Sequence, residues 1–218
     1  MSAAPDPADA GARRYHHGNL AAALVDAGFE LARTGGPDAV VLREAARRVG
    51  VSAAAAYRHF AGHAALRLAV KERAMQELGA QMAAAASAAL PAGAAGDPAA
   101  EIGRFAALGR TYLDFALRES GLFGCICAGI GEEHDEGSWT LDSATPAFGV
   151  AFDLLGQLVD AGVVPEQFRR SGALVAWAAV HGLAMLTLAG PLADFTDDQR
   201  EALYDDAVHI LLQGLMAR

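Results

Sequence analysis

The sequence holds little cysteine and no segment typical of export. Its 218 residues include two cysteines, Cys125 and Cys127, which are too few for a disulfide framework. No basic stretch, apolar stretch and cleavage site open the chain as in a signal peptide. We therefore expect a cytoplasmic protein. Residues 1–12 are polar and rich in Pro and Ala, which predicts a flexible tail.

Motifs of the common enzyme classes are absent as well. The chain has no Gly-x-Ser-x-Gly elbow, no phosphate-binding loop and no His-Glu-x-x-His pair. Cys125 and Cys127, with Glu132, Glu133 and His134 nearby, leave a metal or thiol-sensor site as an alternative. Residues i and i+2 of a helix point apart, however, so both sulfur atoms would not reach one ion. We expect no catalytic residues, no cofactor and no metal.

Positive charge is scarce over the whole chain but not in its first third. The sequence has 17 Lys and Arg against 26 Asp and Glu, and its formal net charge is −9. Such a balance argues against nucleic acid, because phosphate binding is dominated by Lys and Arg. Residues 11–75, however, hold ten Lys and Arg against five Asp and Glu, whereas residues 76–218 carry a net charge of −12. This asymmetry favours nucleic-acid binding by the first third alone.

Alternating strand patterns are nearly missing, while Ala, Leu, Arg and Glu recur at helical spacing. With 53% apolar residues the chain can bury a large core, so we expect an all-α protein. Asp97 and Thr196 are good N-caps, and the segment 91–98 is a convincing linker. The pattern predicts nine helices, over residues 19–34, 42–48, 53–60, 63–89, 98–119, 121–130, 140–161, 166–189 and 197–216.

One apolar stretch is long enough to cross a membrane. Residues 173–193 carry no formal charge at neutral pH over 21 positions, about the length of a bilayer span. Two glycines, Pro191 and the central His181 weaken that reading, and no basic flank follows. A helix buried on all sides is the alternative that we favour, so we expect no membrane contact.

Residues 41–60 (VLREAARRVGVSAAAAYRHF) have the form of a helix-turn-helix. A glycine turn at Gly50 follows the first helix, and Ser52 can cap the second. This arrangement sets the second helix across the first, as a helix that enters the major groove requires. Many helical hairpins look alike, so the pattern alone leaves DNA binding open.

The segment from Tyr15 to Leu78, with YHHGNL, LREAARRVGVS and the YRHF ending, closely resembles the DNA-binding domain of the tetracycline-repressor (TetR) family. Further on, WAAVHGLAML (Trp177–Leu186) resembles the Trp-x-x-x-His-Gly element of one C-terminal domain class in that family. The resemblance implies a three-helix reader at 13–75, joined by a long helix to an effector-binding and dimerisation domain at 76–218. It further implies a homodimer closed by the last two helices.

From this resemblance we expect a transcription regulator: a repressor of a palindromic double-stranded DNA operator, released by a small, largely apolar effector. The alternative is a helical small-molecule-binding protein in which the helix-turn-helix is only structural. Steep salt dependence of DNA binding would favour the regulator.

We expect four residues of this segment to contact DNA. Arg43 lies in the first turn of the supporting helix, where it can reach phosphate or a guanine edge. Tyr57 and His59 match the family's backbone-contacting positions, which fix register without reading sequence. Ser52 is interpreted as a helix cap, as a phosphate donor, or as both.

The predicted recognition helix is poor in hydrogen-bonding groups. Its Ala53, Ala54 and Ala55 offer only methyl contact to thymine, as does the Ala56 that follows them, so readout would fall on Arg43, Tyr57 and Arg58, with help from DNA shape. Arg13 and Arg14 precede the first helix and form either a minor-groove arm or a solvated pair that improves solubility. The second reading is the one we favour.

Two departures from the family pattern affect the reader. Val41 stands where a Ser or Thr N-cap is usual, which should cost about 1 kcal/mol of helix stability. Gly62-His63 replaces the usual Asp-Lys at the start of the fourth helix. The phosphate contact of that lysine becomes neutral or pH-dependent at His63.

The second half of the chain carries most of the aromatic residues. In a helical bundle such side chains line either the core or an apolar pocket, and a regulator needs a pocket whose ligand biases the spacing of its two readers. His181 follows Trp177 on one helical face, as a core histidine or as a ligand contact. Our candidates for the pocket are Phe105, Phe123, Phe148, Phe152, Trp177 and His181.

Overall fold

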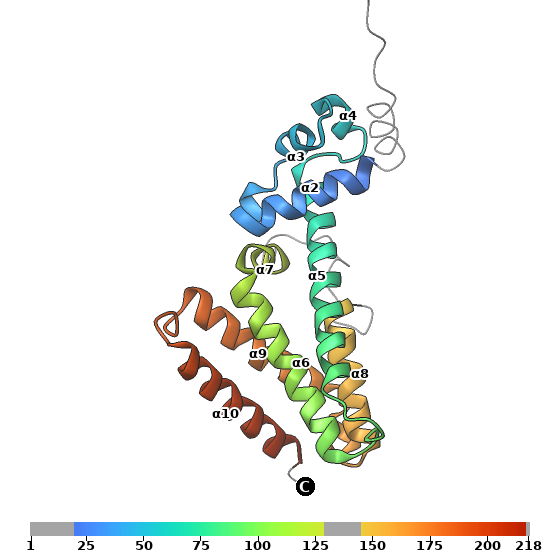
Figure 1. Ribbon diagram of the computed structural model, residues 1–218, viewed down its shortest axis with the longest axis vertical. Coiled ribbons are helices and arrows are strands. Elements are labelled where there is room, and N and C mark those ends of the chain that lie inside the picture. Colours follow the sequence, from blue (N-terminus) through green and yellow to red (C-terminus); the bar gives the residue numbers. More distant parts are fainter. Residues whose placement is uncertain (1–19, 129–144, 217–218) are drawn as a thin grey trace, which may run out of the picture.

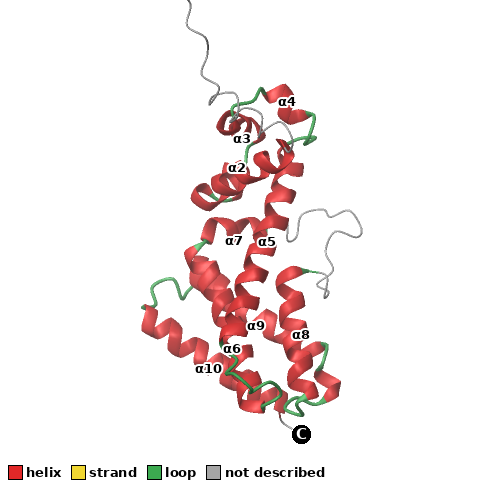
Figure 2. Ribbon diagram, turned by 45° about the vertical axis from the view of Figure 1, so that its right-hand side comes forward, coloured by secondary structure: helices red, strands yellow, loops and turns green. Residues whose placement is uncertain are grey.

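The computed structural model describes residues 20–128 and 145–216, which contain nine α-helices, two short 3-10 turns and no strand. The all-α prediction is confirmed. A small domain of three helices lies at one end of an elongated molecule, and a helical bundle forms the rest (Figure 1). Figure 2 shows the same arrangement from a second side.

The small domain consists of α2 (Leu20–Gly35), the 3-10 turn η1 (Pro37–Ala39), α3 (Leu42–Val49) and α4 (Ala53–Tyr57). Helix α2 ends where two glycines and a proline follow each other, as the sequence predicted. Helix α4 is shorter than predicted, because the chain turns after Tyr57 and the Phe60 N–H donates to the Ala56 carbonyl. Phe60 packs against the core from that turn.

Helix α5 (His63–Ala88) connects the small domain to the bundle without a break. Its buried residues recur at intervals of three and four and form one stripe along the helix. The first of them, Leu66 and Val70, meet α2 at Gly28, while Gly79 further along meets the start of α8. The predicted boundary between residues 75 and 76 therefore falls inside a continuous helix.

The bundle adds α6 (Pro98–Arg118), α7 (Ser120–Cys127), α8 (Pro146–Asp160), α9 (Ser171–Ala189) and α10 (Asp197–Met216) to α5. Both predicted caps are present. Asp97 accepts from the Ala100 N–H at 3.0 Å. At α10, the Gln199 N–H donates to Thr196 Oγ1 at 3.3 Å and the Thr196 N–H donates to Gln199 Oε1 at 2.9 Å, which is a complete capping box.

Three further helix boundaries differ from the prediction. The segment predicted as one helix over 166–189 divides into η2 (Glu166–Phe168) and α9. Arg169 causes the division: it donates to the Gly156 carbonyl and pairs with Asp160 at 2.7 Å, which holds η2 against the end of α8. Helix α7 ends at Cys127, because Ala128 is extended, and α8 begins at Pro146, because Thr145 before it is extended.

Helix α9 is the one candidate membrane span in the described part of the chain. It is 19 residues long with a mean hydropathy of 1.7, and 22% of it is buried. The expectation of a helix buried on all sides is therefore wrong for the single chain. Leu174, Val175, Met185 and Leu186 are between 41% and 52% exposed and form a broad apolar surface.

Candidate nucleic-acid interface and ligand pocket

The turn between α3 and α4 has the geometry that a helix-turn-helix needs. Gly50 adopts a left-handed conformation with φ of 78°, which residues without a Cβ tolerate best. Its N–H donates to the Arg47 carbonyl, and the Val51 N–H donates to the Ala46 carbonyl. Ser52 then accepts from the Ala55 N–H at 3.2 Å and caps α4. The capping reading of Ser52 is confirmed, and it leaves the phosphate reading open.

Exposed basic and polar side chains gather around this turn. Arg43, Arg58, His59 and His63 are exposed, and Tyr57 is 42% exposed. Within the part of the chain that the structure describes, Arg43 and Arg58 form no ion pair, so both guanidinium groups are available to phosphate or base edges.

Helix α3 also carries Arg47 and Arg48, which the sequence analysis did not single out. Both pair with Glu44, at 2.7 and 3.5 Å, and hydrogen bonding by Arg47 lowers the pKa of the Glu44 carboxyl. A regular i, i+3 and i, i+4 spacing from Glu44 predicts these pairs. They reduce the positive charge that α3 presents and leave Arg43 as its one cation without an ion pair among the described residues.

The alanines of α4 do not share one environment. Ala56 is fully buried, Ala53 and Ala55 are half-buried, and Ala54 is exposed. The helix therefore packs most of its alanine surface against α2 and α3. Val41 begins α3 without a side-chain cap, as expected. Arg13 and Arg14 lie outside the described residues.

A pocket lies in the bundle between α6, α9 and α10, with α5 and α8 at its floor. Its free volume is about 50 Å³. Two of the six predicted pocket residues, Phe105 and Trp177, line it. The other lining residues are Met82, Leu108, Gly109, Ala151, Ala176, Ala179, Val180, Leu183, Tyr204, Ala207, Val208 and Leu211.

Three other predicted pocket residues meet in an aromatic cluster next to the pocket. Tyr112 lies at its centre, with ring centroids 5.7 Å from Phe123 and 4.9 Å from Trp177, both edge to face. Its hydroxyl forms a 2.8 Å hydrogen bond with His181 Nδ1. Phe148 packs on Trp177 at 5.7 Å. Phe152, the sixth residue, is 6.4 Å from Phe148.

Tyr204 forms the α10 side of the pocket and was not among the predicted residues. Its hydroxyl donates to the Ala106 carbonyl of α6. This bond requires Gly109, because a Cβ at that position would lie 2.6 Å from the Tyr204 hydroxyl oxygen. Arg110 lies over the Tyr204 ring, 4.7 Å from its centroid, and pairs with Glu201 and Asp205. Helix α10 is thus held on α6 by one tyrosine and one arginine.

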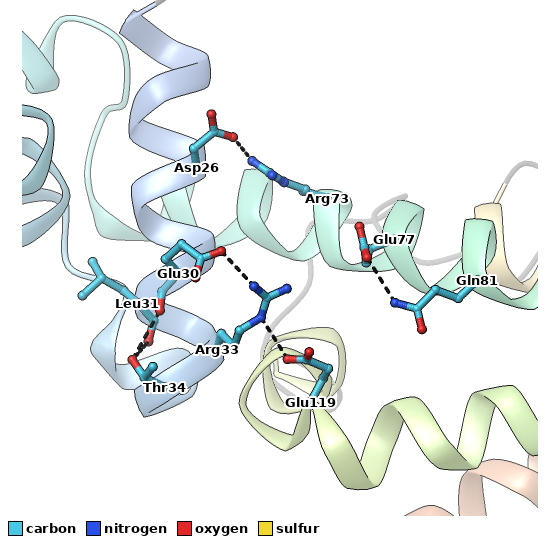
Figure 3. A network of polar contacts seen from close by, with 9 residues as sticks. All are labelled: Asp26, Glu30, Leu31, Arg33, Thr34, Arg73, Glu77, Gln81 and Glu119. Carbon is cyan, nitrogen blue, oxygen red and sulfur yellow. Dashed lines mark hydrogen bonds and ion pairs between the residues drawn. The ribbon is translucent and has the colours of Figure 1, made fainter.

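The two halves of the molecule meet where α6 turns into α7. Glu119 at that corner pairs with Arg33 of α2 at 3.0 Å, and Arg33 also pairs with Glu30, as Figure 3 shows. Gly121 lies against the α2 backbone. A Cβ at this position would be 2.9 Å from the Arg33 carbonyl oxygen. Helix α6, which lines the pocket, therefore ends on a helix of the small domain.

The cysteines lie in α7, the helix that follows this corner. Burial raises the pKa of each thiol to about 11, so both stay protonated near neutral pH. Lys71 donates to the Ala128 carbonyl at 2.8 Å beside them. The residues described contain no group of three His, Cys, Asp or Glu side chains able to hold a metal. Glu132, Glu133 and His134 are outside those residues.

A helix-turn-helix domain on an all-helical bundle defines a class of DNA-binding regulators, and comparison with known proteins agrees. Residues 24–70 match the model of bacterial regulatory proteins of the tetR family, and residues 105–211 match a tetracycline-repressor-like C-terminal domain. Together the two matches cover more than two thirds of the chain. The chain belongs to the tetracycline-repressor family and is a DNA-binding transcription regulator.

Two solved structures resemble the whole chain. A protein of unknown function from Rhodococcus sp. RHA1 is 27% identical, with a TM-score of 0.72 over 93% of this chain and 98% of that one. The proposed regulatory protein SCO4313 is 22% identical, with a TM-score of 0.58 over 92% of this chain and 98% of that one, and supports the fold alone. No curated protein matches the sequence significantly.

Proposed function

We propose that this protein is a cytoplasmic repressor that binds a palindromic operator as a homodimer and leaves it when a small apolar effector occupies the bundle pocket. The observation that carries the DNA-binding part is the capped helix-turn-helix with Arg43 and Arg58 exposed and unpaired within the described residues. Tyr57, His59 and His63 would contact the DNA backbone beside them. Ser52 would add a phosphate contact. Ala53, Ala54 and Ala55 would add methyl contacts to thymine. The segment with Arg13 and Arg14 is either a minor-groove arm or a solvated pair.

The exposed apolar surface of α9 supports the homodimer. The exposed face of α9 is unusually apolar for a solvated surface, because it carries Leu174, Val175, Met185 and Leu186. On α10, the helix that follows, Ile210 is 71% exposed. Large exposed apolar patches mark interaction sites. A second copy of the chain could pack its own last two helices on this surface. The apolar surfaces of both copies would then be buried in a four-helix interface.

Trp177, His181 and Gly182 support assignment to the Trp-x-x-x-His-Gly class of C-terminal domains. In this chain Trp177 and His181 of α9 both contact Tyr112 of α6, the first by ring packing and the second by a hydrogen bond. A change in the pocket would thus reach α6 directly, and α6 ends on α2 through Glu119. This path supports coupling between the effector pocket and the DNA-binding domain, because both would act on the position of α6.

The experiment is a fluorescence-anisotropy titration of the protein with duplex from its own upstream intergenic region, at two salt concentrations. Tight, sequence-selective binding that weakens steeply with salt is expected. Equal, weak binding to a scrambled duplex would contradict the proposal.

Sedimentation of the wild type and of Leu186→Glu tests the homodimer. The variant should dissociate into monomers. If the variant sediments as the same dimer as the wild type, the interface lies elsewhere.

A further inference from the structure

The pocket between α6, α9 and α10 has walls that suit only one class of ligand. Among its fourteen lining residues none carries a charge, and the single ionisable group is the Tyr204 phenol. Burial raises the pKa of that phenol far above neutrality, so it is uncharged as well. An isolated ion moved into such surroundings loses its hydration without gaining a partner, which is very unfavourable.

The arginine of α6 that stands next to the lining is not available to a ligand either. Arg110 is adjacent to Gly109, but its guanidinium lies over the Tyr204 ring and pairs with Glu201 and Asp205. Its positive charge is already balanced by two carboxylates. A carboxylate ligand would therefore have to compete with both, and an ammonium ligand would meet no anion in the lining.

Hydrogen-bonding capacity in the lining is limited to two side chains. The Tyr204 hydroxyl is engaged, because it donates to the Ala106 carbonyl. The Trp177 indole N–H donates to no other residue in the segments that the structure describes, although Trp177 lines the pocket. An indole N–H is a donor only, and in apolar surroundings it gains from meeting an acceptor.

The size of the pocket sets a further limit. An engineered apolar cavity of about 150 Å³ binds benzene, whereas this pocket offers about 50 Å³. A ring-sized ligand must therefore move a wall. We expect the α10 wall to move, because the only residues of that helix that are buried are Tyr204, Leu212 and Leu215. Larger molecules would have to separate α10 from α6 altogether.

We propose that this pocket takes an uncharged, mainly hydrocarbon molecule about as large as one substituted aromatic ring, with one hydrogen-bond acceptor that receives the Trp177 indole N–H. The inference rests on the proposed function in placing the effector here. Trp177 is thus a specificity-determining residue, and the apolar walls supply the rest of the affinity.

Calorimetric titration of the full-length protein with four probes of one ring tests the proposal: acetophenone, toluene, benzoate and benzylamine. Acetophenone should bind about three- to tenfold more tightly than toluene, the range that one hydrogen bond confers. Benzoate and benzylamine should bind at least about 100-fold more weakly than acetophenone. A charged probe that binds as tightly as acetophenone would overturn the proposal, and so would the failure of all four to bind.

Variants separate the hydrogen bond from the shape of the pocket. Trp177→Phe keeps an aromatic ring against Tyr112 and Phe148 but removes the donor, so acetophenone and toluene should then bind with equal affinity. Phe152→Leu changes an aromatic side chain that does not line the pocket and should keep the wild-type preference. A preference that survives Trp177→Phe would overturn the role of the indole. These titrations contain no DNA, so their failure is distinct from a failure to bind the operator.

Discussion

The Tyr112 hydroxyl of α6 and Nδ1 of His181 in α9 lie 2.8 Å apart, inside an otherwise apolar cluster. Burial raises the pKa of Tyr112 and lowers the pKa of His181, so both partners are neutral in the folded protein near neutral pH. This bond is the polar connection between the helix that bears Trp177 and the helix that reaches the DNA-binding domain.

Tyr112→Phe should destabilise the protein by about 1 kcal/mol, because it removes the bond and leaves a half-buried histidine nitrogen without its partner. Urea denaturation measures the difference. In a His181→Gln background the same Tyr112→Phe change should cost less. An equal cost in both backgrounds would show that the two side chains do not act together.

The lowered pKa of His181 predicts a dependence of stability on pH. The unfolded chain binds the proton with a pKa near 6.5 and the folded chain binds it only at lower pH. Stability is therefore full above pH 6.5 and falls as the pH drops from there toward the folded pKa. Unfolding at pH 7.5 and at pH 5.5 should show a larger loss in the wild type than in His181→Gln. An identical loss in both proteins would exclude His181 as the source.

Gly121 predicts a steric requirement at the junction of the two domains. A Cβ there would collide with the Ala32 carbonyl oxygen and lie 2.9 Å from that of Arg33. Backbone atoms cannot yield as side chains do, so Gly121→Ala should cost about 1–3 kcal/mol. Gly103→Ala is the control: it is exposed on α6 with nothing within 4 Å of the new Cβ. It should raise stability by about 0.5–1 kcal/mol. Thermal unfolding of both variants checks this, and matching melting temperatures would contradict the close contact.

His63 predicts a gain of affinity on substitution. It is the exposed first residue of α5, beside the recognition helix. His63→Lys should tighten operator binding and steepen its salt dependence by about one counterion per subunit. Gln76→Lys adds the same charge to the same helix about 20 Å further along and should change neither. Unchanged affinity of His63→Lys at two salt concentrations would refute the phosphate contact.

Local signals in the sequence predicted most of the helices. Gly35, Asp97 and Thr196 mark helix ends through backbone chemistry that a short window reveals, and the structure places all three at such ends. The division at Arg169 escaped prediction, because it depends on contacts with Asp160 and Gly156 of another helix.

The pocket was harder to predict than the helices around it. Phe105 and Trp177 were foreseen as large aromatic residues, but much of the lining is alanine and glycine, which leave no pattern in the sequence. Tyr204 reaches α6 only because Gly109, 95 positions earlier, makes room for its hydroxyl. Such long-range complementarity between small and large residues appears only once the helices are packed.

The central claim is that the α3–α4 unit binds the operator, and two matched arginine variants test it most directly. Arg43→Ala removes the cation of α3 that forms no ion pair with the described residues, whereas Arg170→Ala removes an exposed arginine at the start of α9. In anisotropy titrations with upstream duplex, Arg43→Ala should lower affinity about tenfold or more, in line with the 1–3 kcal/mol of a base or phosphate contact, and Arg170→Ala should leave it unchanged. Equal affinities of Arg43→Ala and the wild type would contradict the claim.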